Sequence, residues 1–109
     1  MNGGEIVTVN FQGATGIKRR PAIVVSTDEY HKNRPDVILA IITTQVSSAN
    51  SITDYLLQDW KTAGLHKPSA FRAYFGTYDR REIVSMIGKV SDRDWHEIQA
   101  RIRLAIATN

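Results

Sequence analysis

The sequence predicts an α+β fold in which a small, strongly bent antiparallel β-sheet, or partial β-barrel, is covered by a C-terminal α-helix. Three observations lead to this fold class. Short segments with a two-residue apolar period recur between residues 5 and 90, loops of uneven length separate them, and helical periodicity is strong only after residue 91. A chain of 109 residues builds one core of ordinary size, so we expect residues 1–109 to form a single domain.

The first two strands are expected to pair as an antiparallel hairpin. Residues 5–11 alternate apolar and polar side chains, as a half-buried strand does, and residues 22–26 form a short, apolar, β-branched run. Between them, glycines and small polar residues at positions 12–17 predict a mobile loop whose base the two strands would anchor.

A single helical turn and a central strand are expected next. Residues 27–35 begin with Thr27 and Asp28, either of which can cap a helix, and end at Pro35, which cannot continue one. Residues 37–42 are the most apolar run in the chain. Their β-branched content and short length predict a strand in the centre of the sheet.

The middle of the chain alternates loops with short extended segments. Residues 46–53 are rich in serine and poor in apolar side chains, which predicts a loop, and residues 55–57 are expected to form a short edge strand. Residues 59–64 predict one capped turn that ends at its glycine, and residues 70–77 predict a further strand.

The last third begins with a strand. After a polar turn at residues 79–82, residues 83–90 predict a strand that Gly88 bends or bulges. Ser91 then caps the predicted helix, with Asp94 at the third helical position, where an acid favours the positive end of the helix dipole.

The predicted helix has one apolar face that should pack on the sheet. Its members recur at steps of three and four residues: Trp95, Ile98, Ile102, Ala105 and Ile106. On the outer face, Arg93–Glu97 and Glu97–Arg101 are expected to form ion pairs, each worth about 0.2–0.5 kcal/mol.

Composition limits the classes of function. With 42% hydrophobic and 23% charged residues, the chain is typical of a soluble globular protein. A net charge of +3 and a pI near 9.5 permit a polyanionic partner without requiring one. The absence of cysteine excludes disulfides and thiolate nucleophiles, and no apolar run approaches the roughly 18 residues of a membrane span. We therefore expect a cytoplasmic protein that neither enters a membrane nor carries a secretion signal.

Several kinds of chemistry lack their usual residues. His31, His66 and His96 are widely spaced and have no carboxylate at ligand spacing, so no metal site is expected. No Ser-His-Asp order, glycine-serine elbow or glycine-lysine phosphate loop is present. Acyl transfer, nucleotide hydrolysis and bound cofactors are therefore not expected.

A cluster of cations precedes the second predicted strand. Lys18, Arg19 and Arg20 lead directly into Pro21, whose ring fixes its own φ and favours extended geometry at Arg20. The backbone at Arg20 is thereby restricted, which limits where its guanidinium can lie. The planar set of N–H donors on that group matches the oxygen atoms of a phosphate.

Other groups suited to phosphate lie near strand ends or within strands. Thr43 and Thr44 follow the central strand and offer short hydroxyl donors, while Arg72 lies in the later extended segment. Two interpretations stay open on the residues alone. These groups could bind a phosphate, or Arg19 could be solvated, Thr43 could simply close a strand and Arg72 could form a surface ion pair.

Aromatic residues surround Arg72. An exposed aromatic ring beside cations is typical of single-stranded nucleic-acid binding, where each stacked base contributes about 1–3 kcal/mol. Strand alternation should place Phe71 and Phe75 in the core, which leaves Tyr74 as the exposed candidate.

Short motifs along almost the whole chain point to one family by their order and spacing. They lie at residues 4–7, 20–25, 40–43, 59–60, 63–65, 68–69 and 87–91. Together they resemble the PemK/MazF family, the endoribonuclease toxins of bacterial type II toxin–antitoxin pairs.

The resemblance implies a homodimeric, SH3-like barrel with a C-terminal helix, as in CcdB and MazF toxins. It also implies metal-independent, sequence-selective cleavage of single-stranded messenger RNA, in which the 2′-hydroxyl attacks the phosphate and leaves a 2′,3′-cyclic phosphate. The implied partners are RNA and a cognate antitoxin, with DNA bound only through the antitoxin.

Carried over by position, the catalytic residues of the family match Arg20 and Thr43. Thr43 would donate to a phosphate oxygen, and Arg20 would stabilise the developing charge. Residues expected to bind RNA are Lys18, Arg19, Thr44, Arg72 and Tyr74.

One departure from the family pattern concerns the general base. Some relatives place an acid two residues after the arginine that matches Arg72, whereas this chain has Tyr74 there. Arginine, with a pKa above about 12, is a poor base. The group that takes the 2′-hydroxyl proton is therefore open, with Tyr74 as one hypothesis.

Two alternatives keep the fold without the activity. The chain could be a binding toxin of the CcdB type, although its tail, residues 107–109, lacks the aromatic end that those toxins carry. It could also be an inactive member that only binds an antitoxin or nucleic acid.

Overall fold

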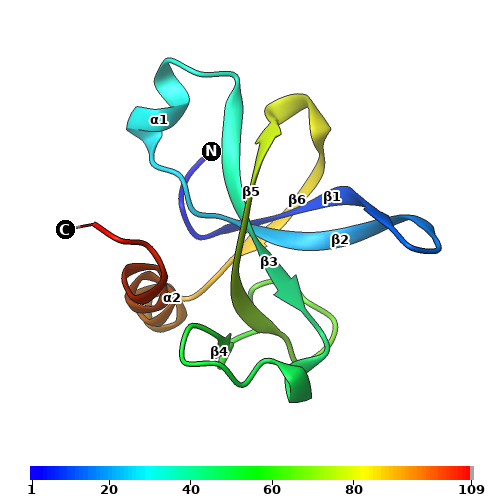
Figure 1. The fold of residues 1–109 in the computed structure, drawn as a ribbon, viewed down its shortest axis with the longest axis vertical. Coiled ribbons are helices and arrows are strands. Elements are labelled where there is room, and N and C mark those ends of the chain that lie inside the picture. Colours follow the sequence, from blue (N-terminus) through cyan, green and yellow to red (C-terminus); the bar gives the residue numbers. More distant parts are fainter. Residues whose placement is uncertain (109) are drawn as a thin grey trace.

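The structure is a computed structural model that describes residues 1–108, and it confirms the predicted fold class. One antiparallel six-stranded sheet, in the order β4-β5-β3-β2-β1-β6, is strongly bent, and helix α2 packs beside β4 and β5 (Figure 1). The elements are β1 (Glu5–Gly13), β2 (Gly16–Val24), α1 (Asp28–Lys32), β3 (Asp36–Thr43), a 3₁₀ turn (Val46–Ser48), β4 (Tyr55–Leu56), β5 (Ala70–Asp79), a second 3₁₀ turn (Arg80–Glu82), β6 (Ile83–Lys89) and α2 (Asp92–Ala105).

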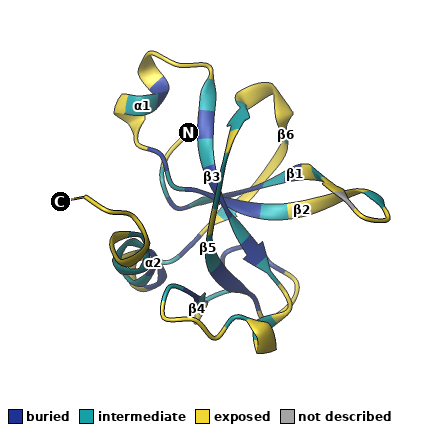
Figure 2. Ribbon diagram, in the orientation of Figure 1, coloured by how far each residue is buried: buried dark blue, intermediate teal, exposed yellow. Residues whose placement is uncertain are grey.

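The hairpin of β1 and β2 is longer than predicted. Its ladder continues to the pair Gly13 and Gly16, so a turn of two residues replaces the mobile loop expected at residues 12–17, and that expectation was wrong. The physical reason is that Gly16 has a φ of +117°, a backbone conformation that glycine adopts without strain and that lets the chain reverse in a tight turn. As a result the cations at residues 18–20 lie inside β2 rather than before it, on an arm whose tip is exposed (Figure 2).

The middle of the chain agrees with its prediction. Strand β3 lies between β2 and β5 in the centre of the sheet, and β4 is a short edge strand. In helix α1, the Thr27 side chain accepts a hydrogen bond from the Tyr30 backbone N–H at 3.2 Å, which is the expected cap. The turn before residue 65 ends at Gly64, whose φ of +92° suits glycine.

Two apolar clusters fill the two faces of the sheet. Successive residues of a strand point to opposite faces, so Ile6 joins one cluster and Val7 the other. The first cluster lies under α2 and comprises Ile6, Ile23, Ala40, Ile42, Leu57, Ala63, Leu65, Phe71, Val90 and Ile98. The second lies on the opposite face and comprises Val7, Val9, Ala22, Val24, Val37 and Leu39, with Phe11, Tyr78 and Ile83 packed against it.

Helix α2 contributes only the first part of its predicted apolar face. Ile98 is fully buried, and Trp95 and Ile102 are partly buried against the first cluster. Ala105 and Ile106 are exposed, contrary to the prediction, because the helix ends at Ala105 and the chain leaves the sheet there. Of the helices within residues 1–108, none has the length and apolar content to cross a bilayer.

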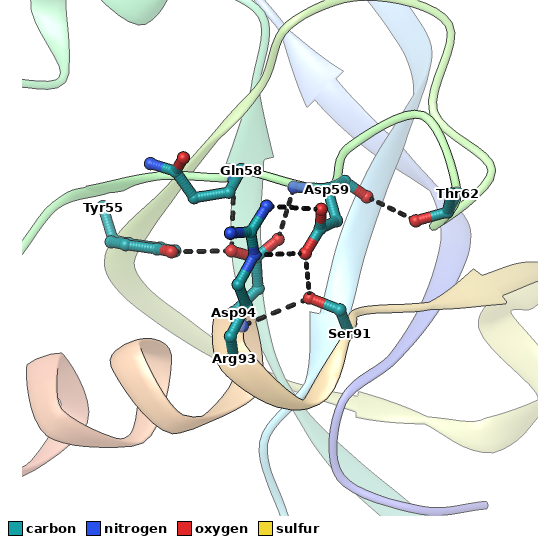
Figure 3. Close-up of polar contacts among 7 residues, drawn as sticks. All are labelled: Tyr55, Gln58, Asp59, Thr62, Ser91, Arg93 and Asp94. Carbon is teal, nitrogen blue, oxygen red and sulfur yellow. Dashed lines mark hydrogen bonds and ion pairs between the residues drawn. The ribbon is translucent and has the colours of Figure 1, made fainter.

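The N-terminal end of α2 is joined to residues 55–59 by polar contacts (Figure 3). Asp94 is fully buried, and its carboxylate accepts from the Tyr55 hydroxyl at 2.6 Å and from the backbone N–H groups of Gln58 and Asp59 at 3.0 and 2.8 Å. Ser91 caps the helix as predicted, since its hydroxyl accepts from the Asp94 backbone N–H. We call these residues the α2 clamp: Tyr55, Gln58, Asp59, Ser91, Arg93 and Asp94.

Asp59 is the second carboxylate of the α2 clamp. It accepts two hydrogen bonds from Arg93, at 2.7 and 2.8 Å, and one from the Ser91 hydroxyl at 2.6 Å. These donors, Arg93 first, lower the pKa of Asp59 to about 2. The predicted pair Arg93–Glu97 was wrong because Arg93 binds Asp59 instead, whereas Glu97–Arg101 is confirmed at 2.6 Å.

Strand β6 bulges beside Gly88, as predicted. The register passes from Ile6–Gly88 to Val7–Met86, which leaves Ile87 as the extra residue. A Cβ atom at Gly88 would lie 2.2 Å from the Ala63 carbonyl oxygen, so only glycine fits this approach of two backbones.

Candidate functional site

Two adjoining hollows open on the face of the sheet that carries the second apolar cluster. One, of about 400 Å³, is lined by Phe11, Arg20, Pro21, Ile41, Ile42, Thr43, Thr44, Gln45 and Tyr74. The other, of about 510 Å³, is lined by Ile41, Thr43, Ser51, Thr53, Asp54, Arg72, Ala73 and Tyr74. Because Ile41, Thr43 and Tyr74 line both, we treat them as one groove with an Arg20 end and an Arg72 end.

Strand register explains why Arg20 and Thr43 meet at this groove. Ala22 of β2 pairs with Ile41 of β3, and side chains two residues away on each strand point to the same face. Arg20 and Thr43 are those residues. The recorded pairing of β2 with β3 stops at Ala22, so the strands part where the Arg20 end of the groove opens.

The Arg20 side chain is exposed and carries an unneutralised charge. Within residues 1–108, no ion pair includes Arg20, whereas Arg34, Arg72, Arg81, Arg93 and Arg101 each have an acidic partner. The proline that follows Arg20 restricts its backbone to extended geometry. A rigidly placed guanidinium without an acid is suited to bind an anion.

Thr43 offers a hydroxyl that can still donate. Its Oγ1 atom accepts a hydrogen bond from the Gln45 backbone N–H at 3.1 Å, which fixes the side chain at the end of β3. A hydroxyl has one donor and two acceptor positions, so this bond leaves its proton available. Thr44, which is exposed, lines the same end of the groove.

The Arg72 end contains an acid that the sequence did not single out. Arg72 pairs across the ladder with Ile41, and its Nε lies 3.5 Å from Asp54 Oδ1. The Asp54 side chain is only 4% exposed, while that of Arg72 is 43% exposed. The ion pair foreseen for Arg72 therefore exists, with a buried carboxylate as its partner.

Tyr74 lies where the two ends of the groove join. Its side chain is 70% exposed, as predicted, while Phe71 is fully buried and Phe75 is partly buried. An exposed ring beside arginines is a surface on which a nucleobase could stack.

The remaining predicted residues lie elsewhere. Lys18 and Arg19 are exposed on the hairpin and line neither hollow. Lys18 pairs across the ladder with Phe11, and Arg19 Nε reaches Asn10 Oδ1 at 3.4 Å on the opposite face from Arg20. The structure thus brings Arg20, Thr43, Thr44, Arg72 and Tyr74 together and leaves the other two cations on the arm.

The groove also contains residues that the sequence reasoning missed. Phe11 and Ile41 are apolar residues that line it, and Phe11 packs edge to face on Tyr78, at 5.8 Å between ring centroids. Burial raises the pKa of Tyr78. Asp54 could have been found only from the pairing of β4 with β5, which places it opposite Arg72.

A third hollow shares two lining residues with the Arg20 end of the groove. It measures about 320 Å³ and shares Pro21 and Thr44 with that end, and its other lining residues are Thr8, Gly64, Leu65, His66, Lys67, Ser69 and Ile87.

The histidine and acidic side chains are dispersed. Across residues 1–108, no three histidine, cysteine, aspartate or glutamate side chains lie together as metal ligands do. His31 is buried, and its ring nitrogens contact the Ser26 hydroxyl at 2.6 Å and the Met1 carbonyl oxygen at 2.9 Å.

Comparison with known proteins gives one family. The sequence profile of the PemK-like, MazF-like toxins of type II toxin–antitoxin systems matches residues 2–106. No curated protein matches the chain by sequence.

Solved structures share the fold at low identity. An endoribonuclease in complex with its cognate antitoxin, from a mycobacterial species, has a TM-score of 0.81 at 17% identity, covering 100% of this chain and 97% of that chain. The Mycobacterium tuberculosis toxin MazF-mt6 has a TM-score of 0.76 at 19% identity, covering 93% and 94%. A chain of the MazE-MazF crystal structure from Deinococcus radiodurans has a TM-score of 0.74 at 16% identity, covering 100% and 97%.

Proposed function

Because the chain belongs to the PemK-like, MazF-like toxins of type II toxin–antitoxin systems, we propose that it acts as an endoribonuclease on single-stranded RNA, including messenger RNA. The observation that carries this proposal is the shared hollow of Arg20 and Thr43, an unneutralised guanidinium beside a free hydroxyl donor. Structural neighbours with the same fold include proteins described as endoribonucleases.

The proposed reaction is a transesterification at one phosphate. The ribose 2′-oxygen forms a bond to phosphorus, the bond from phosphorus to the 5′-oxygen breaks, and the products carry a 2′,3′-cyclic phosphate and a 5′-hydroxyl. Arg20 stabilises the negative charge that grows on the phosphate oxygens, and Thr43 donates a hydrogen bond to one of them. Since Arg20 supplies the positive charge, the reaction is proposed to need no metal ion.

A single strand is proposed as the substrate rather than a duplex. Bases must be unstacked from a duplex before side chains can hold them from both sides, and single strands supply such bases without that cost. Tyr74 is proposed to stack on a base near the cut site, and Thr44 and Arg72 to contact the backbone or base edges. Sequence selectivity would then arise from the fit of bases along the groove.

The hairpin arm is proposed to guide RNA to the groove. Lys18 and Arg19 add positive charge on an exposed arm, and such charge raises the rate of encounter with a polyanion without forming part of the reacting site.

Partners follow from the same assignment. A cognate antitoxin is proposed to neutralise the protein by covering the groove, and DNA is proposed to bind only through that antitoxin.

A homodimer is proposed to form through β6, an edge strand whose Val84, Met86 and Ile87 are exposed apolar residues. Since RNA is the proposed substrate, the protein is proposed to act in the cytoplasm.

The decisive experiment measures cleavage directly. Purified protein is incubated with single-stranded RNA in the presence of a chelator, and the ends of the products are sequenced. Arg20→Ala and Thr43→Ala are each expected to lower cleavage by about 10²–10³-fold, with unchanged circular dichroism. Arg19→Ala, a neighbouring arginine on the opposite face of β2, is the matched control and should still cut. Undiminished cleavage by the Arg20→Ala protein would contradict the role of Arg20.

A further inference from the structure

A buried carboxylate opens into the groove beside Arg72. Asp54 lines the Arg72 end together with Thr43 and Tyr74, and it is the one acidic residue that lines either end of the groove within residues 1–108. Resting on the proposed ribonuclease function, we propose that Asp54 is the general base that takes the proton from the attacking 2′-hydroxyl.

The fold fixes Asp54 in this place. Tyr55 pairs with Phe71 in the antiparallel ladder of β4 and β5, so the residue before Tyr55 lies opposite Arg72. Tyr55 points to the other face, where its hydroxyl donates to the buried Asp94 at 2.6 Å. The α2 clamp therefore holds the backbone that carries Asp54, as a reacting group requires.

The two oxygens of Asp54 have different surroundings. Oδ2 accepts a hydrogen bond from the Ser51 backbone N–H at 3.0 Å, which sets the orientation of the carboxylate. Oδ1 faces Arg72 at 3.5 Å, which is longer than the usual range for an N–H···O hydrogen bond. Oδ1 thus keeps lone pairs that can receive a proton.

The other groups in the groove are weaker candidates for this step. Arginine is protonated at all working pH values, and a tyrosine hydroxyl must first lose a proton that is normally held up to about pH 10. An aspartate side chain is ordinarily an anion at neutral pH, so it can accept a proton without prior ionisation. Some relatives carry an acid at the position that Tyr74 occupies in β5. In this chain Asp54, from the loop before β4, supplies an acid to the groove instead.

The step balances without a further reactant. As the 2′-oxygen bonds to phosphorus, its proton passes to Asp54 Oδ1. The 5′-oxygen leaves with the electron pair of the broken bond and takes a proton from water, and Asp54 later returns its proton to solvent. Arg72 keeps the carboxylate aligned and adds positive charge near the phosphate.

The test compares Asp54→Asn, Asp54→Ala and Tyr74→Phe in the full chain. The substrate is an RNA oligonucleotide with a mapped cut site, and binding is measured with the same oligonucleotide carrying a 2′-deoxy residue there. Asp54→Asn keeps an oxygen for the Ser51 N–H, so its fold should persist. It is expected to lower kcat by about 10²–10⁴-fold, the usual contribution of a general base, with Kd changed less than about threefold.

Chemical rescue separates a base from a positioning role. Added formate or acetate should restore part of the cleavage by Asp54→Ala, because a small carboxylate can enter the space left by the side chain. Glu29→Gln, an exposed acid in α1, is the control and should match the unaltered protein.

Three results would overturn the assignment. One is a kcat for Asp54→Asn within about threefold of the unaltered protein, and another is a loss that appears only in Kd and is not rescued. The third is a loss of kcat for Tyr74→Phe as large as that for Asp54→Asn. If the unaltered protein cuts no RNA, the proposed function itself fails, which is a separate and recognisable outcome.

Discussion

The α2 clamp and the groove are both built from charged side chains, yet they treat those charges in opposite ways. In the clamp, Arg93 donates two hydrogen bonds to Asp59. The buried Asp94 accepts three more, from Tyr55, Gln58 and Asp59. In the groove, Arg20 has no acidic partner within residues 1–108. Charges that are satisfied internally hold the fold together, whereas a charge left without a partner is available to a ligand.

Removal of the Arg20 side chain should affect cleavage and leave the fold intact. Arg20→Ala is expected to reduce cleavage by about 10³-fold, since each lost stabilising donor costs about 10²–10³-fold in kcat. Because the side chain is exposed and unpaired, the free energy of unfolding should change by less than about 0.5 kcal/mol. Cleavage assays and urea unfolding on the same preparation measure both. A large loss of stability would show that Arg20 supports the fold instead.

The second prediction concerns the most buried member of the clamp. Asp94→Ala leaves the Tyr55 hydroxyl and two backbone N–H groups without their acceptor, and it is expected to lower the free energy of unfolding by about 3 kcal/mol. Urea unfolding followed by tryptophan fluorescence checks this value. Tyr55→Phe, which removes one donor and leaves no new unpaired group on Asp94, is the milder control.

A third prediction uses pH to distinguish the clamp from the groove. Arg93 and Ser91 lower the pKa of Asp59 from its ordinary value of 3.8 to about 2, so the stabilisation from ionised Asp59 is complete above pH 4 and is lost as the pH falls through 2. Arg93→Ala should therefore lower the unfolding midpoint at pH 6, and the difference from the unaltered protein should shrink between pH 4 and pH 2. For Arg20→Ala, the difference in unfolding midpoint from the unaltered protein should not change between pH 4 and pH 2.

The smallest effect is expected on the hairpin arm. Lys18→Ala combined with Arg19→Ala should leave kcat unchanged and weaken RNA binding by a few fold at low salt. For single strands, each lost phosphate contact reduces the slope of log K against log salt by about 0.7. Binding titrations between low and moderate salt measure that slope. An unchanged slope would show that the arm does not contact RNA.

Much of the fold followed from local patterns. The strands at residues 5–11, 37–42 and 83–90 and the Ser91 cap were recoverable, because periodicity and capping depend only on nearby residues. The antiparallel hairpin of β1 and β2 was recovered, but its tight turn was not, because the same glycines are compatible with a loose loop or a tight turn. Register with the neighbouring strand decides between them, and that is not a local property.

The site was less predictable than the fold. Residue types and spacing left two interpretations of Arg20, Thr43 and Arg72 open, and the pairing of Arg20 with Thr43 came from the family resemblance. The partners Asp54 for Arg72 and Asp59 for Arg93 both depend on long-range packing. Spacing along the sequence favours the local pair Arg93–Glu97, and it gives no indication that Arg93 pairs with Asp59 instead.

The close approach of Gly64 and Gly88 bears on how sequences with this fold can diverge. A Cβ at Gly64 would lie 2.4 Å from the Ile87 carbonyl oxygen, and one at Gly88 would lie 2.2 Å from that of Ala63. Substitution of either glycine by any other residue would add a Cβ atom and force the two backbones apart. In a genetic selection for survivors of toxin expression, these glycines should therefore yield escape mutations as readily as the residues proposed to bind RNA.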